Sequence, residues 1–284
     1  MSEATLELFG NTLFWPLLTS IATAAIGGLL LAGRPSCGAS RVAVTALFAG
    51  AALGLVLVHD GFRFPPARSP DRLLPLLALV WLLGSFGPGL APRRGRATTL
   101  SGAALLIGVA LLWLLWPLLL RWPPQNSALV LLTGGALWAL LWYSARHGAQ
   151  RDYGASCLLA PLAMTAPVVA IDGSLLIGQF AGVLAATLGG WWLYSLLRAP
   201  CALGGPGSDL VAFALAAVLA MAYFYAGLDL PALLLLALSP LVGVVLAGVL
   251  QALTVWQSRI LAGLACALPG SLALWWVWPQ ESLY

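Results

Sequence analysis

The stretch TTLSGAALLIGVALLWLLWPLLL, residues 98–120, runs from Arg96 to Arg121 without a charged side chain between them. A helix needs about 20 predominantly apolar residues to cross the hydrocarbon core of a bilayer, so this stretch predicts a membrane-spanning helix. The chain of 284 residues shares this character, with 61% hydrophobic and 8% charged residues and a mean hydropathy of +0.97. A water-soluble domain carries about 25% charged residues. The composition therefore predicts an all-α, polytopic integral membrane protein.

Similar apolar stretches follow one another along the chain, separated by charges, proline pairs or glycine clusters. We expect one transmembrane helical domain, residues 1–284, with ten spans over residues 11–33, 41–58, 73–90, 98–120, 127–144, 155–171, 174–197, 209–226, 230–254 and 260–278. Several of these spans are short, so packing or local thinning of the bilayer must accommodate them.

Two segments hint at an internal repeat. Residues 27–37 and 189–201 each hold a glycine pair followed by Arg, Pro and Cys. If the similarity is real, residues 11–120 and 174–278 form parallel repeats around a two-helix linker, residues 127–171, as in some transporters. Coincidence explains the similarity at least as well in a chain so rich in glycine and alanine.

The placement of charged residues predicts the orientation, because inner loops carry an excess of basic residues. All thirteen basic residues are arginines, and with the N-terminus outside nine of them fall on the inner side: Arg34, Arg41, Arg93, Arg94, Arg96, Arg146, Arg151, Arg198 and Arg259. The outer side then holds Arg63, Arg68, Arg72 and Arg121, together with Glu3, Glu7, Asp60, Asp71, Asp172, Asp229 and Glu281; only Asp152 and Asp209 fall inside. We therefore expect both termini outside and a cell-membrane location, of the bacterial inner-membrane kind.

We attribute the net charge of +4 to the arginines that mark the inner side of the membrane. The expected partners are therefore the lipid bilayer and other membrane subunits, and not nucleic acid. The cysteines Cys37, Cys157, Cys201 and Cys266 form no C-x-x-C pair and have no closely spaced histidine. The sequence thus predicts no metal site and no cofactor, and it favours small core residues at these four positions.

The first candidate site is the loop HDGFRFPPARSPDR, residues 59–72, which is the longest polar segment. Arg63 and Arg68 could bind an anion or a lipid headgroup, with His59 and Asp60 as an acid/base pair. The loop also holds Asp71 and Arg72. An ordinary solvated hairpin with salt-bridged charges is the favoured alternative.

The second candidate site is the segment 161–182. Its two prolines, Pro161 and Pro167, predict a broken or kinked helix, and broken helices in membranes often line a cavity. The polar lining would then consist of Thr165, Asp172, Ser174 and Gln179. The alternative is a tight turn with Asp172 as a helix cap and glycines packed against a neighbouring helix.

Three functions remain open. The first is a non-catalytic subunit or scaffold of a membrane assembly, favoured because no ionisable residue falls near the middle of a predicted span. The second is an uncoupled carrier or flippase-like protein for a neutral or lipidic solute, working through the segment 161–182. The third is an outer-leaflet transferase that uses the loop 59–72. No P-loop or hydrolase motif occurs, so the sequence favours a role other than catalysis.

Overall fold

The computed structural model describes residues 3–30, 38–59, 66, 68–90, 96–148, 151–197 and 202–278. Within these residues the regular structure is helical throughout, which confirms the all-α class. The helices are α1 (Glu3–Phe9), the π-helix η1 (Gly10–Phe14), α2 (Trp15–Leu30), α3 (Gly38–Val58), the 3-10 turn η2 (Pro70–Arg72), α4 (Leu73–Leu90), α5 (Arg96–Leu119), α6 (Pro124–Gly148), α7 (Gly154–Asp172), α8 (Leu175–Leu197), α9 (Gly204–Ala226), α10 (Leu230–Val245), α11 (Ala247–Gln251) and α12 (Val255–Val277).

Each predicted span overlaps a helix in the part of the chain that the structure describes, although several ends differ. Eight of these helices are long and apolar enough to cross a membrane. The predicted spans 73–90 and 230–254 are not among the eight, and α10 is only 16 residues long. The chain is therefore a multi-pass helical protein suited to a membrane.

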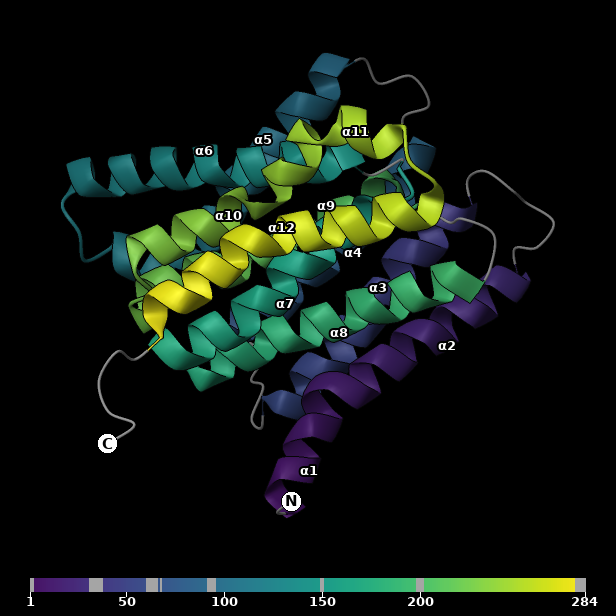
Figure 1. Cartoon of the computed structure of the whole chain (residues 1–284). Coiled ribbons are helices and arrows are strands. Elements are labelled where there is room, and N and C mark those ends of the chain that lie inside the picture. Colours follow the sequence, from purple (N-terminus) through teal and green to yellow (C-terminus); the bar gives the residue numbers. More distant parts are fainter. Residues whose placement is uncertain are drawn as a thin grey trace.

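The helices form a bundle in which α8 and α9 lie at the centre (Figure 1). In the most apolar stretch of α8, 72% of the residues are buried, against 22% in α6 and 17% in the combined helix α1–α2. The peripheral helices therefore present most of their apolar surface outward, as lipid-facing helices do.

Glycines bring neighbouring helices of the bundle into close contact. A Cβ added to Gly50 of α3 would lie 2.8 Å from the carbonyl oxygen of Pro16, and one added to Gly54 would lie 2.6 Å from the Pro16 ring. A Cβ on Gly178 of α8 would lie 2.8 Å from the carbonyl oxygen of Ala166. Small residues thus let the backbones approach where lipid gives no hydrophobic driving force between helices.

Helices α2 and α8 pack side by side and run in the same direction (Figure 1). Gly182 meets Thr12 near the start of this contact, and Gly190 meets Ser20 further along it. The two helices are the first members of the two repeats that the sequence suggested. The repeat itself stays a prediction.

The C-terminal part differs from the prediction. The single span expected over residues 230–254 ends at Val245, and the short helix α11 follows after Leu246. Helix α12 then begins at Val255, earlier than expected, because Thr254 and Gln257 form a capping box. Arg259, expected in an inner loop, consequently lies in the second turn of α12 and is only 4% exposed.

Two further predicted helix ends were wrong because charged residues lie within the helices. Helix α6 extends to Gly148, so Arg146 lies in its last turn and not in a loop. Helix α9 begins at Gly204, so Asp209 lies inside its N-terminal part. The predicted helices were too short because each was ended at a charged residue. In the structure the two charges pair with each other, so both residues remain within their helices.

The predicted break in the segment 161–182 is absent, because α7 continues through Pro161 and Pro167 to Asp172. A proline removes one backbone hydrogen bond, and a helix can continue if neighbouring groups satisfy the freed carbonyls. The carbonyls freed here are those of Cys157 and Ala163, four residues before each proline. The hydroxyl of Thr165 donates a 2.7 Å hydrogen bond to a different carbonyl, that of Pro161. The turn after Asp172, which separates α7 from α8, is as expected.

Candidate functional site

His59 and Asp71 form the best-defined polar pair of the candidate loop 59–72. His59 follows the last turn of α3, and Asp71 lies in η2 just before α4. The Nε2 atom of His59 lies 2.7 Å from Oδ1 of Asp71, and the backbone N–H of Arg68 donates to Oδ2 at 3.0 Å. The Asp71 side chain is only 2% exposed and that of His59 is 12% exposed. The pair therefore ties the end of α3 to the start of α4 in a sheltered place.

The electrostatics of this pair favour an ionised carboxylate. Burial alone would raise the pKa of Asp71, but the hydrogen bonds from Arg68 and His59 and the nearby positive charges outweigh it and lower that pKa below its usual 3.8. Because an ionised carboxylate only accepts hydrogen bonds, Nε2 of His59 carries the hydrogen. In a neutral ring Nδ1 is then the basic nitrogen, which is the arrangement that an acid/base histidine requires.

The expected acid/base partner of His59 was Asp60. Asp60 and Arg63 lie outside the described residues, and the carboxylate observed on His59 belongs to Asp71. Arg68 is exposed, so its guanidinium is accessible to an anion from solution. The structure thus brings together His59, Arg68 and Asp71 from the candidate loop.

Arg72, the last residue of the candidate loop, contacts α5. Its Nη1 atom donates a 2.6 Å hydrogen bond to the carbonyl of Trp113, and its guanidinium lies 5.8 Å from the centre of that indole ring. Pro117 lacks the N–H that would bond to this carbonyl in a regular helix, so Arg72 supplies the missing donor. The hydroxyl of Tyr225 donates to the next carbonyl, that of Leu114, at 2.8 Å. Arg72 therefore anchors α4 to the proline site of α5.

The two candidate segments meet at one point, since the His59 ring packs edge-on against Phe180 of α8, with ring centres 6.1 Å apart. Gln179, the residue before Phe180, is half-buried. Two of the other predicted lining residues form hydrogen bonds within their own part of the chain. Thr165 bonds within α7, and Ser174 accepts a 3.4 Å hydrogen bond from the N–H of Ile177 at the start of α8.

Asp172 serves as a link between helix ends. Its Oδ2 accepts a 3.0 Å hydrogen bond from the backbone N–H of Asp229, the residue that precedes α10. It therefore joins the end of α7 to the start of α10, and it caps neither α7 nor α8. The sequence suggested Asp172, Gly173 and Ser174 as an N-cap signal for the span 174–197. The structure shows the hydroxyl of Ser174 at the start of that helix and Asp172 in contact with Asp229 instead.

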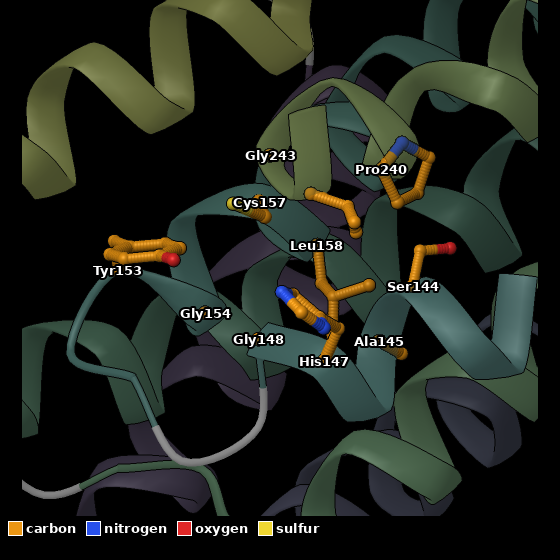
Figure 2. A pocket seen from close by; sticks show the side chains of 11 residues that line it. Ser144, Ala145, His147, Gly148, Tyr153, Gly154, Cys157, Leu158, Pro240 and Gly243 are labelled. Atoms are coloured by element: carbon orange, nitrogen blue, oxygen red, sulfur yellow. The ribbon is translucent and has the colours of Figure 1, made fainter. Parts of the chain in front are cut away.

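Two small cavities lie elsewhere. One, of about 10 Å³, is enclosed by apolar residues of α3, α4, α7, α8 and α9 with Thr187. The other, also about 10 Å³, lies where α6, α7 and α10 meet and is lined by His147, Tyr153 and Cys157 among others (Figure 2). Each has room for about one water molecule. Neither is lined by Asp172 or Gln179.

A charged cluster at the opposite end of the bundle was missed by the sequence analysis. Nε and Nη2 of Arg146 donate to the two carboxylate oxygens of Asp209 at 2.7 and 2.5 Å, and the indole N–H of Trp142 donates to the same carboxylate at 2.8 Å. The guanidinium also lies 5.2 Å from the centre of the Trp142 ring. This two-point geometry fixes α6 against α9. The shared inner-side assignment of Arg146 and Asp209 was the one signal in the sequence that could have suggested the pair.

Among the described residues no group of three or more His, Cys, Asp or Glu side chains could hold a metal ion. No known protein family matches the chain, and no curated protein matches it significantly.

Proposed function

We propose that the chain is a ten-span protein of the cell membrane with both termini outside, and that it is a non-catalytic subunit or scaffold of a larger membrane assembly. The proposal rests on where its glycines lie, on how its charges are paired, and on which helix ends share one side of the bundle.

The positions of the paired charges support the topology. Arg146 joins the end of α6 to the start of α9, and Arg259 donates a 3.1 Å hydrogen bond to the Asp152 carbonyl and so joins the start of α12 to that of α7. All four helix ends belong to the expected inner side. The Asp172–Asp229 and His59–Asp71 contacts join helix ends expected outside.

The main support for the scaffold role is a pair of glycines on α5 that have open space beside them. A Cβ on Gly102 or Gly108 would meet nothing within 4 Å, unlike the glycines packed between α2, α3, α7 and α8. They flank an exposed stripe that includes Leu105, which is 70% exposed, and Leu112. Small residues beside an apolar stripe are typical of close helix–helix contacts in membranes. The fitting occupant is a transmembrane helix of another subunit.

The test is purification of the tagged chain from native membranes in mild detergent, with the stoichiometry read by native mass spectrometry. We expect a second membrane protein in fixed ratio, lost in the Gly108→Leu variant. Gly248→Leu is the matched control, since a Cβ there also meets nothing within 4 Å but the residue lies on α11. A monomer, or a complex of identical chains alone, would argue against the proposal.

A second candidate function is favoured by one specific observation, the sheltered His59–Asp71 pair with exposed Arg68 beside it. We propose as the alternative a transferase at the outer leaflet, with His59 as the general base and Arg68 as the anion-binding group. A deletion strain should then show an altered profile of lipid or surface-polymer headgroups by mass spectrometry. Wild type and His147→Ala should restore the profile and His59→Ala should not. Full restoration by His59→Ala would eliminate this alternative.

A further inference from the structure

A small buried cluster stands apart from the main core, near the start of α7. It consists of Tyr153, Cys157, Leu250, Ala262 and Cys266, contributed by the start of α7, α11 and α12. The start of α7 is about 100 residues from α11 and α12 in the sequence, yet together they bury the cluster almost fully. It contains the only two cysteines within the described residues, both as free thiols.

The two thiols lie close together. Both belong to the same buried cluster, and both sulfur atoms lie beside Gly243 of α10. The Cβ of a larger residue at position 243 would collide with the Cys157 sulfur and would lie 3.5 Å from that of Cys266. The absence of a side chain at Gly243 thus lets both sulfur atoms lie against the same point of α10.

The groups around the thiols suit a negative charge that the free thiols lack. The hydroxyl of Tyr153 is buried and makes no hydrogen bond within the described residues, although such a group normally has a partner. It belongs to the residue four positions before Cys157, and therefore to the same helix face. Figure 2 shows the Tyr153 ring and the Cys157 sulfur beside the cavity that both line.

Arg259 adds a positive charge to this region. Its side chain is buried, and in the part of the chain that the structure describes it bonds to the neutral Asp152 carbonyl and pairs with no carboxylate. A buried charge without a counter-charge is costly. Arg259 lies seven residues before Cys266, two helical turns away on the same face of α12.

We propose that Cys157 and Cys266 bind a soft monovalent metal ion of the Cu(I) class between their sulfur atoms. Thiolates select soft ions such as Cu(I). Zn(II) requires four ligands, and no cluster of three ligating side chains exists among the described residues. Cu(I), in contrast, is satisfied by two thiolates in a nearly linear arrangement.

The charges balance in this assignment. Binding of one Cu(I) releases the two thiol protons and leaves a centre with one net negative charge. The Cys157 thiolate then offers an acceptor to the Tyr153 hydroxyl, which accounts for that buried, unpaired group. The negative centre lies about two helical turns, roughly 10 Å, from the buried charge of Arg259, so it supplies this end of the bundle with an opposite charge.

The test is titration of the full-length, reduced protein in detergent with Cu(I), in competition with the chelator bathocuproine disulfonate. We expect one tightly bound Cu(I) per chain. Cys157→Ser and Cys266→Ser should each weaken binding by more than about 100-fold, since loss of outer-shell groups alone costs 10- to 100-fold. Tyr153→Phe removes only the unpaired hydroxyl, so it should keep the fold and weaken binding by about 10-fold.

Cys37→Ser and Cys201→Ser are the matched controls and should bind as the wild type does. X-ray absorption at the copper edge of the wild type should show two sulfur neighbours, and it decides the matter even if a serine variant fails to fold. Absence of tight binding by the wild type, nitrogen or oxygen ligation, or unchanged binding by the Cys157→Ser/Cys266→Ser double variant would each overturn the proposal.

Discussion

Replacing Gly190 by alanine should separate α2 from α8, whereas the same change at its neighbour Gly189 should not. The new Cβ at position 190 would lie 2.6 Å from the carbonyl oxygen of Leu17 and 3.0 Å from Cβ of Ser20. At position 189 the nearest atom is a methyl carbon of Leu159 at 3.9 Å, an ordinary contact. Overpacking of this kind costs about 1 to 3 kcal/mol, because backbone atoms must move.

The two variants form an internal control. Both gain the higher helix propensity of alanine, worth about 1 kcal/mol, so the difference between them isolates the packing cost. Equilibrium unfolding in detergent micelles should place Gly190→Ala about 1 to 3 kcal/mol below Gly189→Ala. Equal stability of the two variants would refute the close packing of α2 on α8.

Three further predictions concern the polar contacts. Arg146→Ala and Asp209→Ala should each lower the free energy of unfolding by about 1 to 3 kcal/mol in the same assay, a cost between those of exposed and buried ion pairs. The double variant should be little less stable than either single variant. Because the pKa of Asp71 is lowered in the folded protein, its carboxylate stabilises the fold fully above the ordinary pKa of 3.8, and this stabilisation is lost as the pH falls through the lower folded value. The stability of Asp71→Asn should therefore change less with pH than that of the wild type below about pH 4. Arg72→Ala should cost about 1 kcal/mol in the wild type and close to nothing in a Pro117→Ala background, where the helix supplies its own donor.

The apolar stretches predicted the helices well because lipid leaves the backbone few alternatives. Every N–H and C=O within the hydrocarbon must be bonded inside the chain, so a long apolar run becomes a helix. The stretch 174–197 accordingly appears as α8, Leu175–Leu197. Helix ends that contain charges were predicted poorly. Arg146 and Asp209 stay within their helices because each neutralises the charge of the other. A prediction that ends every helix at a charged residue misses such pairs.

The candidate sites could be predicted only as segments. The polar composition of residues 59–72 singled out the loop that holds His59, but its path decides which carboxylate the ring meets, and the structure shows Asp71. The pairing of Cys157 with Cys266 depends on how α7, α10 and α12 pack, so neither sequence spacing nor composition could suggest it.

The central claim is that the helices cross a bilayer with the arginine-rich turns inside and both termini outside. Labelling of single cysteines by a membrane-impermeant maleimide in intact cells tests it directly, after the four native cysteines have been replaced. We expect Ser282→Cys to be labelled in intact cells and Gln150→Cys to be labelled only after the membrane is permeabilised. Labelling of both positions from the same side would contradict it.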